Sequence, residues 1–209
     1  MAKRKQKKPS CKISASLVSS HESWQTISEG CQIFSFPKEW IVEKYDAWRF
    51  VKYDVGDEHL GFNGIKEKGI KSVDFCAIDT DSCLWLIEVK DFRKGRKDND
   101  IGIFNNIVDK ILYSMSGLFA ARYTAERETE KKFAQQAATT QKMRFVLQIE
   151  VQTTTDFDSY FIDIADIQHK MEQKLSRIAP NPIVASMNNL QGLPWNVCDV
   201  TNKPRRKLR

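Results

Sequence analysis

Apolar and polar residues recur along this chain with helical and with strand periods. Residues 35–50 (SFPKEWIVEKYDAWRF) place Trp40 and Trp48 on one side of a helix at 100° per residue, with acidic residues on the opposite side. Pro37 falls in the first turn, where proline is tolerated. The pattern therefore predicts a helix over residues 35–50, and the residues RFVKYDV that overlap its end, 49–55, predict a first strand.

The remaining chain alternates between further strands and helices. Strands are predicted at residues 70–79, 83–91 and 143–151, with short ones at 182–187 and 195–200; helices are predicted from Ile101 onwards and over residues 163–178, and residues 126–143 continue as the same helix or a second one. The helix from Ile101 carries a broad apolar stripe that includes Leu112 and Phe119. This order predicts an α/β chain with a central mixed β-sheet flanked by helices.

Charge is distributed unevenly between the ends and the body of the chain. Residues 1–12 and 203–209 hold 11 of the 33 Lys and Arg residues and no acid, which leaves 22 basic against 27 acidic residues and a body charge of −5. Such tails suit a polyanion, or they serve solubility or nuclear targeting. We expect a flexible basic tail at residues 1–20, a single domain over 21–202 and a second basic tail at 203–209.

No apolar run approaches the roughly 20 residues that span a membrane, and no apolar stretch follows the basic N-terminus. We therefore expect a soluble intracellular protein without a membrane partner, in the cytoplasm or in the nucleus.

Three charges interrupt the two apolar strands at residues 70–79 and 83–91. Glu88 and Lys90 share one face of their strand because they are two residues apart. A three-residue loop at 80–82 would pair Asp74 with Glu88 and collect all three charges at one end of one face, whereas a slip by one residue would scatter them over both faces. We therefore predict the register with the three-residue loop.

This register places the carboxylates of Asp74 and Glu88 side by side, about 5 Å apart at Cβ. Two like charges on a partly buried face need compensation, and Mg²⁺ prefers oxygen ligands such as one or two carboxylates. Lys90 would neutralise the pair, contact a phosphate or help to deprotonate a water. The alternative is a strand end in water, where Lys90 forms a plain salt bridge.

The acid Asp74 on one strand and the triplet Glu88-Val89-Lys90 on the next resemble the motif of the PD-(D/E)XK nuclease superfamily. That family has a restriction endonuclease-like α-β-β-β-α-β core, and the resemblance covers residues 35–151. It implies that Asp74, Glu88 and Lys90 are catalytic. It also implies that Asp74, Glu88 and the carbonyl of Val89 hold Mg²⁺ or Mn²⁺.

The resemblance also implies auxiliary residues around this centre. The candidates are Glu43 from the first helix, with Glu39 in reserve, and Asn106, Asp109, Lys110 and Tyr113 from the helix after the third strand. Basic residues in the following loop would contact the nucleic-acid backbone: Arg93, Lys94, Arg96 and Lys97.

From this resemblance we expect a metal-dependent endonuclease that hydrolyses DNA phosphodiester bonds in a restriction, repair or defence system, with RNA as an alternative substrate. Cutting both strands would favour a homodimer or a larger protein complex. Two alternatives remain open at this point: a module of the same fold that binds nucleic acid or scaffolds a partner without turnover, and an interaction protein whose basic tails bind RNA or DNA.

Overall fold

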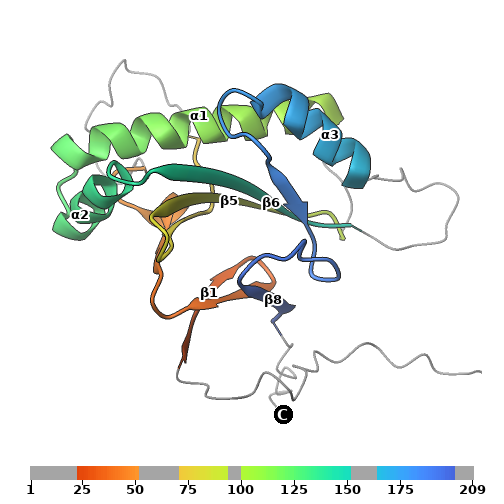
Figure 1. The fold of residues 1–209 in the computed structure, drawn as a ribbon, viewed down its shortest axis with the longest axis horizontal. Coiled ribbons are helices and arrows are strands. Elements are labelled where there is room, and N and C mark those ends of the chain that lie inside the picture. The colour runs from red at the N-terminus through yellow and green to blue at the C-terminus, as the bar shows by residue number, and fades with distance from the viewer. Residues whose placement is uncertain (1–22, 52–70, 94–99, 152–163, 201–209) are drawn as a thin grey trace, which may run out of the picture. The chain divides into compact units, whose positions relative to one another are not determined.

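The computed structural model describes residues 23–51, 71–93, 100–151 and 164–200 (Figure 1). The chain divides into two compact units, residues 1–38 with 194–209, and residues 39–193. The single domain expected over residues 21–202 stays a prediction. The two expected tails lie outside the described residues. None of the described helices is long and apolar enough to cross a membrane.

The first unit contains a three-stranded antiparallel sheet with the order β1-β2-β8. Its strands are β1 (Trp24–Glu29), β2 (Gln32–Pro37) and β8 (Asn196–Asp199). Phe34 and Phe36 of β2 are fully buried, and the ring of Phe36 lies 5.3 Å from that of the buried Trp195. Every second residue of β2 is buried, which is the period of a strand with one covered face.

The second unit contains a five-stranded mixed sheet with the order β3-β4-β5-β6-β7. Its strands are β3 (Ile41–Lys44), β4 (Phe75–Ile78), β5 (Cys83–Asp91), β6 (Lys142–Glu150) and β7 (Ile183–Ala185). β3, β4 and β5 are antiparallel neighbours, whereas β5, β6 and β7 run parallel. The structure therefore confirms an α/β chain with a mixed sheet.

This unit has the described helices α1 (Asp100–Thr124), α2 (Glu128–Ala137) and α3 (Ile164–Leu175). Figure 1 shows α1 and α3 over one face of the sheet, and α2 beside one end of α1. Ile107 and Ile111 of α1 pack into one core with Leu86 and Leu147 of the sheet. Because the sheet contacts α1 on one side only, the predicted apolar stripe is broader than the buried one, and Leu112 and Phe119 are exposed.

The helix predicted over residues 35–50 is wrong. Those residues form the end of β2, a turn, β3 and a short 3₁₀ helix at Tyr45–Ala47. β2 pairs along its length with β1, and β3 pairs with β4, so hydrogen bonds to distant strands override the local helical pattern. β3 also takes the place of the strand expected at 49–55, of which 49–51 form a turn and 52–55 lie outside the described residues.

The predicted register of the β4–β5 hairpin is confirmed. The paired residues are Phe75 with Ile87, Cys76 with Leu86, Ala77 with Trp85, and Ile78 with Leu84. The backbone N–H of Asp79 donates to the carbonyl of Cys83 at 3.1 Å, which closes the three-residue loop. Ser82, its last residue, has a left-handed φ of 55°, as the third position of such loops requires.

The side chain of Asp79 holds the loop together. Its Oδ1 accepts hydrogen bonds from the backbone N–H groups of Asp81 and Cys83, both at 2.9 Å. Its Oδ2 accepts one from the indole Nε1 of Trp85 at 2.8 Å. A single carboxylate thus fixes the turn that sets the register of every following pair.

We expect Asp79→Ala to lower the free energy of unfolding by about 2 kcal/mol, because it removes three hydrogen bonds and leaves the Trp85 indole without its partner. Urea unfolding of the variant and the wild type measures this loss. Asp81→Ala is the matched control, and we expect a change below about 0.5 kcal/mol because only the backbone of Asp81 bonds to Asp79. Equal losses in both variants would contradict the role given to Asp79.

Candidate functional site

The three charges of the hairpin meet at the open end of β4 and β5, where Lys110 of α1 lies close to two of them. Continuing the observed register by one residue puts Asp74 opposite Glu88. The backbone N–H of Val89 donates to Asp74 Oδ2 at 2.6 Å, which holds the Asp74 carboxylate against β5. The carbonyl of Asp74 accepts from the N–H of Tyr45 at 2.9 Å. Backbone hydrogen bonds therefore fix Asp74 from two neighbouring segments.

Glu88 is fully buried, with 0% of its surface exposed. Its Oε1 accepts hydrogen bonds from the Nζ atoms of Lys90 and Lys110, each at 2.7 Å. Lys110 also lies 4.0 Å from Asp74 Oδ1. Two ammonium groups thus compensate a pair of carboxylates, and the four groups are formally neutral together.

The second oxygen of Glu88, Oε2, is buried and has no hydrogen-bond partner among the described residues. A buried carboxylate oxygen without a partner costs free energy, and native proteins usually satisfy such atoms with water or an ion. This oxygen is therefore the part of the buried carboxylate that no described group satisfies.

The electrostatic surroundings favour the charged form of Lys110. Burial lowers the pKa of its ammonium group, but the Glu88 carboxylate, and after it the Asp74 carboxylate, raise the pKa by more, so the balance is a raised pKa. Lys110 therefore stays protonated at physiological pH and can act as a fixed positive charge.

The other auxiliary candidates lie in different surroundings. Glu43 stands on strand β3, not on a helix, and accepts a hydrogen bond from Trp48 Nε1 at 3.1 Å. Asn106 and Asp109 both bind the ammonium group of Lys71, at 3.0 and 2.9 Å. Tyr113, the fourth candidate on α1, is half exposed. Of the α1 candidates, Lys110 alone has a described ion pair with Glu88 or Asp74.

The basic loop candidates are only partly described. The guanidinium of Arg93 is bound to Asp91, with Nε 2.8 Å from Oδ1 and Nη2 2.6 Å from Oδ2. This internal ion pair engages the charge that was expected to meet a nucleic-acid backbone. Lys94, Arg96 and Lys97 lie outside the described residues.

Other residues, which the sequence did not single out, hold α1 in its place over the hairpin. The hydroxyl Oγ of Ser114 accepts a hydrogen bond from the N–H of Val73 at 2.9 Å, and its carbonyl accepts one from the Tyr45 hydroxyl at 3.2 Å. Burial raises the pKa of Tyr45, so its hydroxyl remains a donor. A Cβ at Gly117 would lie 2.5 Å from that hydroxyl oxygen. The glycine inside the apolar stripe was the available sequence signal for this close approach.

We expect Lys110→Met to lower the free energy of unfolding by about 2–3 kcal/mol, since the buried Glu88 carboxylate would keep one ammonium partner instead of two. Lys71→Met is the matched control: Lys71 pairs with Asp109 on the surface, where a salt bridge is worth below about 1 kcal/mol. Chemical denaturation of both variants tests the difference. A loss in Lys110→Met no larger than in Lys71→Met would show that Glu88 does not depend on Lys110.

Similarity to a known protein covers most of this chain. No protein-family model matches it, and no solved structure matches it significantly. The chain is similar to the cysteine–tRNA ligase of Neisseria meningitidis serogroup A / serotype 4A (strain DSM 15465 / Z2491), with 29% identity over 214 residues. The match covers 85% of this chain and 30% of the relative, so the chain spans less than a third of the relative's length.

This similarity corrects the function expected from the sequence. The expected metal-dependent endonuclease is a hydrolase, whereas the relative is named as a ligase for cysteine and tRNA. That finding contradicts the expected deoxyribonuclease activity and the expected class of hydrolase. The assignment of Asp74, Glu88, Val89 and Lys90 to a site stays a prediction.

Proposed function

We propose that this chain is a tRNA-binding module in which Asp74 and Glu88 hold a divalent cation, while Lys90 and Lys110 contact a phosphate of the RNA. The observation that carries the proposal is the fully buried Glu88 carboxylate, with two ammonium groups on one oxygen and no described partner on the other. The choice of tRNA comes from the name of the similar ligase.

The donor set fits a hard cation. Asp74 and Glu88 are neighbours that offer carboxylate oxygens, the ligands that Mg²⁺ and Mn²⁺ prefer, and Glu88 Oε2 is the oxygen without a described partner. In the set of metal ligands expected from the sequence, the backbone carbonyl of Val89 is a further ligand. When bound, the cation would supply positive charge for a phosphate oxygen.

The two lysines give the site its affinity for phosphate. A cation on Glu88 weakens the attraction between that carboxylate and the ammonium groups, because like charges repel. Lys90 is more than a quarter exposed and Lys110 about a fifth exposed, so both reach solvent from a buried partner. Ammonium groups released from Glu88 can form charge-assisted hydrogen bonds to phosphate.

We also propose that residues 39–193 have a restriction endonuclease-like core, without the activity of that family. Support comes from the antiparallel order β3-β4-β5, the helix α1 that follows β5, and the parallel strand β6 beside β5. The helix expected before this core is not formed by residues 35–50. A fold hosts many functions, so its activity does not follow from its topology.

Binding of labelled tRNA to the full chain at constant Mg²⁺ tests the RNA part of the proposal. We expect Lys110→Met to weaken binding about tenfold, which corresponds to ~1.4 kcal/mol for one charged contact to phosphate. Lys132→Met, on the exposed surface of α2, is the matched control and should bind like the wild type. Circular dichroism checks that each variant is folded, and a DNA duplex of similar size tests the preference for RNA.

Calorimetric titration of Mn²⁺ into the RNA-free chain tests the cation separately. We expect heat of binding in the wild type and none in Glu88→Gln, which keeps the shape of the side chain but removes its charge. Heat that persists in Glu88→Gln would place the cation elsewhere. Binding of tRNA that ignores Lys110→Met but falls steeply with salt would assign the RNA to the basic tails.

A further inference from the structure

Helix α1 exposes an apolar stripe on the side that faces away from the sheet. Leu112, Phe119 and Tyr123 are 43%, 61% and 60% exposed, and Ser116 lies between them on the same side. From residue 111 to residue 125 the helix contains one charged residue, Arg122. The outer side of a surface helix is normally polar, so a contiguous exposed apolar stripe indicates a contact with another molecule.

Two aromatic rings in this stripe are held in place by Arg122. Its guanidinium lies 4.4 Å from the centre of the Phe119 ring and 4.3 Å from that of Tyr123, and it donates a hydrogen bond to the Tyr123 hydroxyl. The two rings are 5.8 Å apart with planes at 70°. Side chains that are already ordered lose little entropy on binding, which suits them to anchor a contact.

The spacing of the stripe is symmetric. Leu112, Ser116, Phe119 and Tyr123 follow one another at intervals of 4, 3 and 4 residues, which is the spacing of a coiled-coil seam. Read in the opposite direction the intervals are the same. Two copies of this helix in antiparallel orientation would therefore match Leu112 with Tyr123, and the small Ser116 with the large Phe119.

We propose that two copies of this chain form a dimer in which their α1 helices pack antiparallel along this stripe. The contact is isologous, because each copy contributes the same residues about one two-fold axis. Phe119 of each copy packs over Ser116 of the other, where a small side chain leaves room for a ring.

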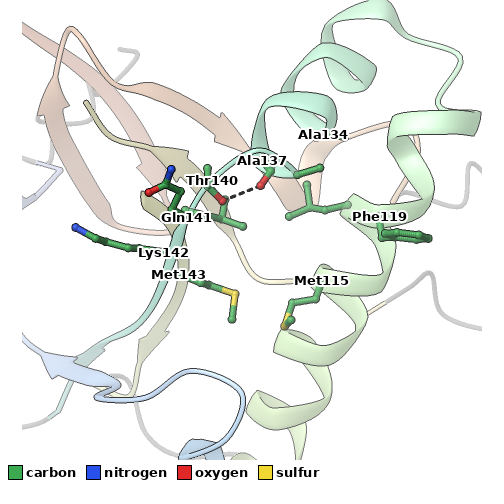
Figure 2. Close-up of a pocket in the computed structure, with 11 residues that line it drawn as sticks. Met115, Phe119, Ala134, Ala137, Thr140, Gln141, Lys142 and Met143 are labelled. Carbon is green, nitrogen blue, oxygen red and sulfur yellow. Dashed lines mark hydrogen bonds between the residues drawn. The ribbon is translucent and has the colours of Figure 1, made fainter. Parts of the chain in front are cut away.

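An apolar cavity beside the stripe extends this surface. It has a volume of about 300 Å³ and lies between α1, α2 and the start of β6. Figure 2 shows Met115 and Met143 facing one another across it, whereas the ring of Phe119 lies on the outer side of α1. In the antiparallel pair, residue 119 of the second copy lies opposite residues 115 and 116, so its ring can contact the flexible Met115 at the cavity edge.

The charges on α1 favour a second copy over a nucleic acid as the occupant. Nucleic-acid surfaces depend on several Lys and Arg residues that neutralise phosphates. Arg122 is the single charge between residues 111 and 125, and its guanidinium is engaged with the two rings. A seam of this length buries less surface than a standard interface of about 1,600 Å², so we expect a dissociation constant on the order of micromolar.

Sedimentation equilibrium of the full chain, up to about 100 µM, tests the dimer against this expected affinity. We expect a concentration-dependent dimer in the wild type and at least a tenfold higher dissociation constant in Phe119→Asp. Phe119 is largely exposed, so the variant should keep its fold, which circular dichroism checks. Gln135→Asp adds the same charge to an exposed position of α2 and should leave the dimer unchanged.

Cysteine cross-linking tests the orientation, in a background where Cys11, Cys31 and Cys198 are replaced by Ser and only the buried Cys76 and Cys83 remain. Under mild oxidation a mixture of Leu112→Cys and Tyr123→Cys chains should form a disulfide between the two variants. Each variant alone should not, because in the antiparallel pair like positions lie about 16 Å apart along the helix, beyond disulfide reach.

Three results would overturn the proposal. The first is a monomer at every concentration, and the second is a dimer that Phe119→Asp leaves intact. The third is cross-linking of Leu112→Cys with itself, which would require a parallel pair. A monomeric chain that loses RNA binding in Phe119→Asp would assign the stripe to nucleic acid. None of these results depends on the cation site, because Glu88 and Lys110 are not altered.

Discussion

Burial of the Glu88 carboxylate is the constraint on which the arrangement of the second unit depends. A carboxylate with 0% exposure is costly unless opposite charges compensate it, and Lys90 and Lys110 do so at 2.7 Å each. Lys90 lies on the same strand, but Lys110 comes from α1. The charge of Glu88 therefore ties the sheet to the helix that covers it, in addition to the apolar contacts of the core.

Polar contacts near Lys110 set the distance of α1 from the sheet and its rotation about its own axis. Ser114, one turn after Lys110, receives hydrogen bonds from the hairpin at Val73 and from Tyr45, and Gly117 leaves the space that the tyrosine needs. At the other end of the helical layer, the buried Glu130 of α2 accepts the backbone N–H groups of Arg49 and Phe50 at 2.8 and 3.2 Å. Buried polar groups thus fix the helices where apolar packing alone would allow sliding.

The hairpin was predictable from the sequence because its register decides whether its three charges share one face. A slip by one residue would have scattered these charges over both faces, so one register was far better than the other. The helix α1 was predictable for a similar reason, since its apolar residues recur at the helical period over many turns. In both cases one local pattern was long enough to exclude its alternatives.

The prediction of a helix over residues 35–50 failed because two short strand patterns follow one another there. Residues 35–37 end β2 in the first unit, whereas Trp40 precedes β3 and Trp48 follows the 3₁₀ helix in the second, and the spacing of these two tryptophans mimicked one helical face. Lys110 was one of four candidates on α1, and the sequence could not single it out, because its contact with Glu88 depends on how α1 is rotated over the sheet. That rotation is set by Tyr45 and Ser114, which are far apart in sequence.

The net charge of the four groups around Glu88 decides which ligands this site can accept. With two carboxylates and two ammonium groups the site is formally neutral, and a divalent cation adds two charges that must be offset. In the proposed complex, a phosphate diester would supply negative charge at the same place. Cation and phosphate should therefore bind with positive coupling, each raising the affinity of the other by the same factor. If the proposed site binds both ligands, each should bind more tightly when the other is present, which suits recognition of RNA that carries its own divalent cations.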